Sequence, residues 1–272
     1  MRLGKYLLLT IALIAISSAL SYAAPVGLTS EADAATSAKV FEKSDIGIEL
    51  SIGGIADIVT KREVNIQNGE FEMDAYLGRI GLSLMEKLYL YVDVGQATNM
   101  EYAYTTLGEN HKVSYEDDLI YGAGLSALIY RWANGLEIGA NGSYRQADLK
   151  LDTVTINNVT FKRSTLTNIS ETEFKEYQAA LEVAWRTEYF IPYAGAKYSD
   201  VELGSDFKIA PQNYSAKGKN ADKNYGAFVG LSITPRTGFL SPSAPDSKPL
   251  SINLEARFID EEAFNVGLSY KF

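Results

Sequence analysis

The segment EEAFNVGLSYKF, residues 261–272, decides the fold class. Its bulky apolar and aromatic side chains occupy every second position: Phe264, Val266, Leu268, Tyr270 and Phe272. Asn265, Gly267, Ser269 and Lys271 stand between them. Because successive side chains of a strand point to opposite faces, this alternation predicts a β-strand with one apolar and one polar face. The apolar face must line a core or contact lipid, and the rest of the chain decides between the two.

The beginning of the chain indicates export. Arg2 and Lys5 are followed by an apolar run of about 15 residues, shorter than the ~20 that a membrane-spanning helix needs. Small residues follow at Ser21 and Ala23, which predicts a signal peptide over residues 1–23 that is cleaved. Residues 24–44 are small and polar, and we expect a flexible periplasmic segment there. The remaining residues, 45–272, form a single predicted domain.

Composition narrows the function classes. The chain has 272 residues and no cysteine, so it has neither a disulfide framework nor a lipid-anchored cysteine. Its net charge of -9 argues against nucleic-acid binding, which requires basic patches. No sequence motif indicates a cofactor. No stretch beyond the signal is long and apolar enough to predict a membrane helix.

The strand pattern of the final segment recurs along the whole domain. Ten segments alternate between apolar and polar residues, over 45–54, 75–84, 88–95, 119–130, 136–145, 176–186, 190–199, 224–234, 251–258 and 264–272. The connections at one end are mostly short, apart from the proline-rich 235–249, whereas at the other end residues 61–70, 105–117, 152–172 and 205–223 form longer polar connections beside one tight turn at 260–262. Short turns on one side and long loops on the other are typical of outer-membrane barrels. A small hairpin is predicted around Asn157 and Asn158, with arms too short to cross a membrane.

Charges and aromatic residues suggest which face meets lipid. The polar faces carry six acids and six bases, Glu49, Arg79, Asp93, Glu137, Arg145, Glu176, Glu182, Arg186, Lys197, Glu255, Arg257 and Lys271. Trp132, Trp185, Tyr189 and Phe190 stand beside short turns, and Tyr102, Tyr104, Tyr115 and Tyr198 stand toward the long connections. Two aromatic levels are what membrane barrels place at the headgroup boundaries. The sequence therefore predicts an all-β fold, a ten-stranded antiparallel up-and-down transmembrane β-barrel.

The last strand resembles the C-terminal signature of bacterial outer-membrane β-barrels, with Phe272 at the end and Tyr270 two residues before it. This class includes small barrels of the OmpA-transmembrane, opacity-like and OmpW-like kinds, and the pattern identifies no one family among them. The resemblance implies location in the bacterial outer membrane, pairing of the last strand with the first, and recognition of the terminal strand by the β-barrel assembly machinery. It also implies contact with outer-membrane lipids and lipopolysaccharide. We expect a monomer.

Catalytic and metal sites are not predicted. The outer-membrane omptin proteases use an Asp pair facing a His-Asp pair, but the one histidine, His111, has no aspartate two residues away. His111 and Ser114 also lack the placement used by barrel-type lipid A deacylases. No paired-histidine metal spacing occurs, and the acidic turn Asp260, Glu261 and Glu262 is expected to be solvated.

The interior charges allow two functions. In a narrow barrel they would pair and fill the lumen, because an unpaired buried charge costs several kcal/mol; ten strands lie near the filled end of the size range. Alternatively, the inward glycines Gly122, Gly124, Gly139, Gly226 and Gly230 could leave a thin water path. We expect a non-enzymatic barrel with a charge-plugged interior and surface loops for structural or interaction roles. A narrow porin for small solutes is the alternative, and an outer-membrane enzyme is third.

Overall fold

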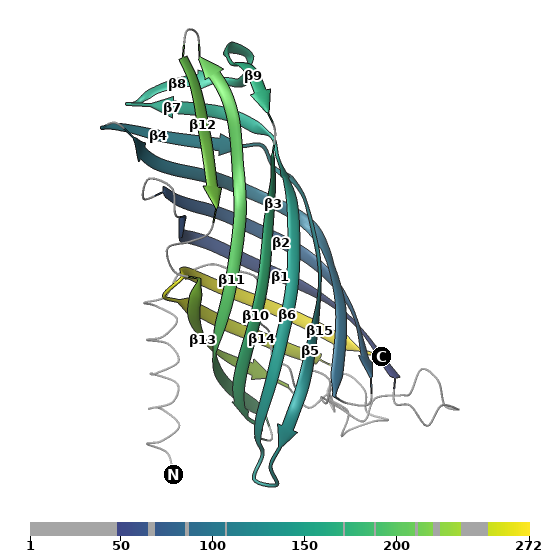
Figure 1. Cartoon of the computed structure of the whole chain (residues 1–272). Helices are drawn as coiled ribbons and strands as arrows, with labels where there is room; N and C mark the ends of the chain where they lie inside the picture. The colour runs from purple at the N-terminus through teal and green to yellow at the C-terminus, as the bar shows by residue number, and fades with distance from the viewer. Residues whose placement is uncertain are drawn as a thin grey trace.

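Ten antiparallel strands close into a barrel in the computed structural model, which describes residues 48–64, 69–84, 87–106, 108–170, 172–187, 189–209, 212–219, 224–234 and 250–272 (Figure 1). The strands follow one another around the wall as β1 (Ile48–Val64), β2 (Gly69–Leu84), β3 (Leu88–Thr106), β5 (Asp118–Arg131), β6 (Leu136–Leu149), β10 (Thr172–Trp185), β11 (Phe190–Ile209), β13 (Tyr225–Ile233), β14 (Leu250–Phe258) and β15 (Glu261–Lys271). The predicted fold class and all ten predicted strands are confirmed.

Closure of the barrel depends on the first and last strands. Ile52 of β1 pairs with Ile80 of β2 on one side and with Tyr270 of β15 on the other. The wall consequently has no free edge at this seam, which removes the row of unpaired backbone groups that an open sheet would present. The pairing implied by the terminal segment is therefore present.

Five further β-strands extend one end of the barrel. These are β4 (Glu109–Tyr115), β7 (Leu151–Ile156), β8 (Val159–Lys162), β9 (Thr167–Ser170) and β12 (Gln212–Lys219), with a short 3-10 helix, η2 (Arg163–Thr165). β4 pairs with β3, β7 with β4 and β8 with β7, while β9 and β12 both pair with β11. We call this the distal end, and the opposite end, where Phe272 and the β5–β6 connection lie, the turn end (Figure 1).

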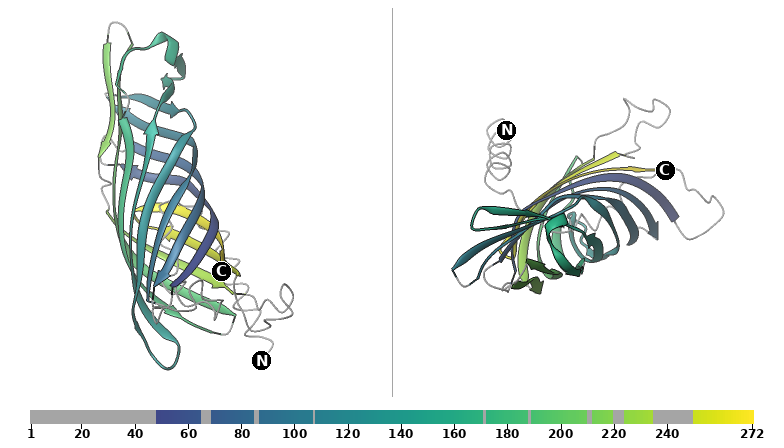
Figure 2. Two further views of the ribbon diagram at one scale, coloured as in Figure 1. Left: turned by 90° about the vertical axis from the view of Figure 1, so that its right-hand side faces the viewer. Right: turned by 90° about the horizontal axis from the view of Figure 1, so that it is seen from above.

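The long polar loops expected at 61–70, 105–117, 152–172 and 205–223 are mostly ordered β-structure. β1, β3 and β11 continue through the first parts of these segments, and β4, β7, β8, β9 and β12 occupy much of the rest. The predicted hairpin around Asn157 and Asn158 is confirmed as the β7–β8 turn, with φ of 46° and 70° at the two asparagines. The wall is uneven, because β13, β14 and β15 stop well below the tip of β11 (Figure 2).

The signal peptide predicted over residues 1–23 and the segment predicted over 24–44 lie outside the described residues, as does the proline-rich connection 235–249. Among the residues that are described, no helix is long and apolar enough to cross a membrane.

Candidate functional site

The lower barrel turns its apolar face outward. Ile80, Val92 and Leu181 expose 57%, 51% and 61% of their surface, although each lies in the middle of a strand. The four aromatic residues expected near short turns, Trp132, Trp185, Tyr189 and Phe190, are exposed at the turn end. Tyr198 is exposed farther up β11, on the distal side of the exposed apolar residues. These side chains form an exposed, largely apolar belt around the lower barrel.

The apolar face changes sides along the strands. On β10, Tyr177 and Leu181 point outward and Glu176 is buried in the lumen, whereas nearer the distal end Glu173 points outward and Phe174 is buried. β11 shows the same change between Lys197 and Val201, two inward residues of opposite character. The strand alternation continues through the change, so only the chemistry of the two faces is exchanged.

The center of the lumen holds an ion-pair network. The Arg145 guanidinium donates to Asp57 Oδ2 and Glu176 Oε2, each over 2.8 Å, and so joins β6 to β1 and β10. Arg257 of β14 donates to the other Asp57 oxygen over 2.6 Å. All four side chains are buried. Since these contacts cross the barrel from several sides, they place charged side chains of opposite sign in the lumen itself.

A second group continues the network toward the distal end. Arg62 donates to Glu176 over 2.6 Å and to Ser199 Oγ over 2.7 Å, and Ser199 in turn donates to Asp260 over 2.7 Å. The Lys197 ammonium lies 2.9 Å from Asp260 Oδ2 and contacts Glu261. Asp260 and Glu261 are thus buried in ion pairs, so the expectation of a solvated acidic turn was wrong for them; Glu262 is exposed.

The other predicted interior charges line the lower lumen. Arg79 forms a two-point contact with Asp93, over 2.7 and 2.8 Å, and lies 3.7 Å over the Tyr91 ring. At the turn end, Arg131 and Arg186 both donate to Glu137 Oε1, over 2.6 and 2.7 Å. Glu182, Glu255 and Lys271 are buried and Glu49 is half-buried, with Glu255 accepting a hydrogen bond from Tyr193 over 3.1 Å.

Large aromatic rings fill the space over two inward glycines. A Cβ atom added at Gly124 would lie within 2.3 Å of the Tyr91 ring, and one added at Gly230 within 2.1 Å of the Tyr193 ring. Gly226 is likewise covered, by Asp260 and Lys197. The expectation that these three glycines leave open space was wrong, because side chains from other parts of the chain occupy the space beside each of them.

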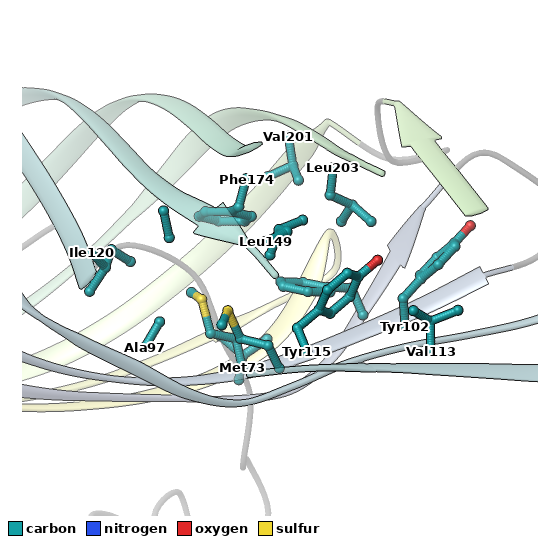
Figure 3. Close-up of a cluster of buried hydrophobic side chains, with 14 of the residues drawn as sticks. Met73, Ala97, Tyr102, Val113, Tyr115, Ile120, Leu149, Phe174, Val201 and Leu203 are labelled. Atoms are coloured by element: carbon teal, nitrogen blue, oxygen red, sulfur yellow. The ribbon is translucent and has the colours of Figure 1, made fainter. Parts of the chain in front are cut away.

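The distal half has an apolar interior, which the sequence interpretation missed. Figure 3 shows part of this cluster, in which Met73, Leu149, Phe174 and Leu203 converge from different strands. Tyr102, Tyr104 and Tyr115 belong to it and are buried, so their predicted place at an outer membrane boundary was wrong. Burial raises the pKa of Tyr102 to about 12. The missed signal was the alternation of Phe71, Met73 and Ala75, which continues the β2 pattern on the opposite face.

Five charged residues of the lumen were also absent from the predicted network, namely Asp57, Arg62, Arg131, Asp260 and Glu261. The first two stand in the part of β1 beyond the predicted strand 45–54, and the last two stand at the predicted tight turn. Extending the alternation of β1 by ten residues would have placed Asp57 on the polar face.

The one histidine packs among aromatic residues at the distal end. His111 of β4 is buried, its ring stacks on Tyr104 with a centroid separation of 4.9 Å, and its Nε2 lies 3.7 Å from Glu109. Asp118, at the start of the next strand, β5, forms an ion pair with Lys150 and not with His111. In the described part of the chain, no group of three or more histidine and acidic residues is placed to hold a metal ion.

Comparisons with known proteins identify no family for this chain. No protein-family model matches the chain, and no curated protein sequence matches it. Similar solved structures include the outer membrane protease OmpT from Escherichia coli, at 12% identity and a TM-score of 0.45 over 88% of this chain and 100% of that one. The β domain of the Bordetella autotransporter BrkA follows at 10% identity and 0.43, over 83% and 98%. Ail of Yersinia pestis has 14% identity and 0.30, over 83% and 97%. At these values the likeness carries no argument about activity.

Proposed function

We propose that this chain is a non-enzymatic barrel of the bacterial outer membrane. Its lumen is closed by paired charges, and its distal β-structure is displayed at the cell surface for structural or interaction roles. The observation that carries the membrane assignment is the exchange of faces along β10 and β11. A barrel in water throughout would have no reason to expose Leu181 and bury Glu176 in one half while doing the reverse in the other.

The closed lumen is supported by the contacts that cross it. Arg145, Asp57, Glu176 and Arg257 connect three sides of the wall through hydrogen-bonded ion pairs. Breaking such a pair leaves an uncompensated buried charge, so the network resists displacement by water or solute. Above it, the apolar cluster around Leu149 and Phe174 adds a second obstruction of opposite chemistry.

Conductance in planar bilayers separates the closed barrel from the narrow porin. We expect purified protein to give no steps above the bilayer background across the range of applied voltage. A wide porin reconstituted in the same way serves as the positive control, and refolding is checked by the heat-dependent mobility shift in detergent gels. Regular steps that scale with salt concentration would favour the porin.

Orientation can be tested because the chain has no cysteine. A cysteine placed at Thr160, exposed in the β7–β8 hairpin, should react with a membrane-impermeant maleimide on intact cells. A cysteine at Asn134, in the exposed β5–β6 connection, should react only after the outer membrane is permeabilised. The reverse pattern would invert the proposed orientation.

Assembly and lipid contact complete the proposal. We propose that the assembly machinery recognises β15 through Tyr270 and Phe272, so deleting Phe272 should lower the amount of protein in the outer membrane.

Lipopolysaccharide contact is assigned to the basic β11–β12 region with Lys208, Lys217 and Lys219, and to Lys223, which lies outside the described residues. Changing all four to glutamine should weaken lipopolysaccharide binding at low salt; unchanged binding would exclude this region.

A further inference from the structure

The distal end is held together by a contact between two hairpins. The β3–β4 hairpin contributes Tyr104 and His111, and the β11–β12 hairpin contributes Phe207 and Tyr214. The His111 ring lies nearly parallel to Tyr104, at 7°, and meets Tyr214 at a centroid separation of 5.8 Å. Tyr214 stacks in turn on Phe207 at 5.7 Å. His111 is thus the polar member of an otherwise aromatic stack that bridges the two hairpins.

The imidazole is unusually isolated for a buried polar group. Its side chain is fully covered, and neither ring nitrogen has a hydrogen-bond partner among the residues that the structure describes. A buried polar group without a partner is costly, and it requires an explanation in the structure. The covered site favours neutral imidazole, because burying a charged ring costs far more free energy than burying a neutral one.

We propose that the contact of His111 with Tyr214 is an acid-released latch, which holds the β11–β12 hairpin against the β3–β4 hairpin while the imidazole is neutral. Protonation would place a charge in this covered site, where the Glu109 carboxylate, 3.7 Å from Nε2, is too distant for a hydrogen bond. Because the His111 side chain is fully covered, water reaches the ring only when the two hairpins separate. Among the described strands, β12 pairs only with β11, and the distal part of β11 pairs with β9 at only two positions, Asp206 with Ser170 and Lys208 with Thr167. The hairpin can therefore swing away with the loss of few backbone contacts.

The groups that face the ring support this direction. Tyr104 approaches the ring from β3 and Tyr214 from β12, and β7 contributes Ile156 opposite His111. Tyr102 stacks on Tyr104. Glu109, on the same strand, is the one nearby charge among these neighbours, and its side chain is 47% exposed.

Burial lowers the pKa of His111 below its ordinary value of 6.5, while Glu109 opposes this effect. The closed form therefore binds fewer protons than the open form, and acid favours opening. Between pH 6.5 and the lowered pKa, the ratio of closed to open forms falls about tenfold per pH unit.

The only histidine of the chain makes the test direct. Histidine-labelled protein in detergent micelles gives one set of imidazole resonances, whose titration midpoint we expect to be below 6.5. Spin labels at Asn110 and Lys208, one on each hairpin, should report a broadened and longer distance over the same pH interval. An ordinary midpoint, or a distance that does not change with pH, would overturn the latch.

Two variants separate protonation from packing. His111→Phe keeps an aromatic ring in the stack but cannot be protonated, and its hairpins should stay together at the pH where the parent opens. Opening of this variant over the same interval would assign the transition to another group. Tyr214→Leu should open at neutral pH, because one face of the stack is lost while His111 remains; if it stays closed, Tyr214 is not part of the latch. Neither readout depends on whether the lumen conducts.

Discussion

In the lower and distal halves of this barrel, the same strands carry their apolar and charged side chains on opposite faces. In the lower half the inner face of β10 carries Glu176 and Glu182 and the outer face carries Leu181, whereas in the distal half the inner face carries Phe174. Water is the poor environment for apolar groups and lipid is the poor environment for charges. The position where the faces exchange, near Tyr177 and Tyr198, therefore marks where the surroundings of the barrel change.

The two interiors are also specific in different ways. The lower lumen relies on directed contacts such as those of Arg145 with Asp57 and Glu176, in which each of the three Arg145 guanidinium nitrogens has a partner. The distal interior relies on shape, with Leu149, Phe174 and their neighbours packed as in a soluble protein. Removing one partner of an ion pair in the lower lumen should therefore lower the free energy of unfolding sharply. Truncating a side chain in the distal interior should lower it in proportion to the volume lost.

The largest effect is expected at the center of the ion-pair network. Arg145→Ala removes the partner of both Asp57 and Glu176 and should lower the free energy of unfolding by about 3–5 kcal/mol. Urea-induced unfolding from lipid vesicles measures this loss. As a control for surface charge removal, Lys162→Ala at the exposed end of β8 should change the value by less than about 0.5 kcal/mol. A loss at Arg145 no larger than that of the control would contradict a tightly coupled network.

The exchange of faces can be tested with one substitution type on two outward positions. Leu181→Arg places a charge in the lipid-facing belt and should cost about 2–4 kcal/mol. Ala103→Arg, outward on the distal part of β3, should cost less than about 0.5 kcal/mol, because that face meets water. Both are measured by refolding into vesicles. Equal costs at the two sites would remove the basis for placing the membrane boundary between them.

The sequence was sufficient for the lower half and insufficient for the distal half. Ten strands, their faces and the aromatic residues near the turns all follow from a two-residue period, since a lipid-facing surface must be continuously apolar. The same period continues into the distal segments, but with Phe71 and Met73 on the face that is polar below. The sequence interpretation places polar loops at 61–70, 105–117, 152–172 and 205–223 and no strand over 71–74. The rule that identifies membrane strands, an apolar outward face, does not hold beyond the membrane.

Long-range contacts of the site were the least predictable part. The charges of Arg79 and Asp93 lie opposite each other on paired strands, so an ion pair could be anticipated from register. The partners of Arg62 are Glu176, Ser199 and Glu261, which come from three other strands and depend on the curvature of the closed wall. The geometry of the β14–β15 turn was equally hard to predict, because the residue types at Phe258 and Ile259 do not indicate that Asp260 points into the lumen.

Strain at the β14–β15 turn gives a prediction of gain. Ile259 has φ of 91°, which is unfavourable for a β-branched residue, and its side chain is 60% exposed. Ile259→Gly should raise the free energy of unfolding by about 1 kcal/mol, because glycine adopts this conformation without a Cβ clash. Urea unfolding from vesicles measures it, with Phe258→Gly, at an ordinary strand position, expected to lose stability. A loss at Ile259 as well would show that its side chain contributes more in the outer boundary than the strain costs.

The most local effect is expected at the turn of the β7–β8 hairpin, in the distal end. Asn157 and Asn158 both have positive φ, which asparagine tolerates better than alanine. Asn157 also accepts a hydrogen bond from the Asn110 backbone over 3.0 Å, so it joins this hairpin to β4. Replacing both asparagines with alanine should cost about 1 kcal/mol locally, seen as faster amide exchange in β7 and β8, whereas exchange in β10 stays unchanged. Asn158→Gly alone should keep exchange at the parent rate or slow it. If the double variant also accelerated exchange in β10, the two halves would unfold as one unit, and their division into separately stabilised regions would be wrong.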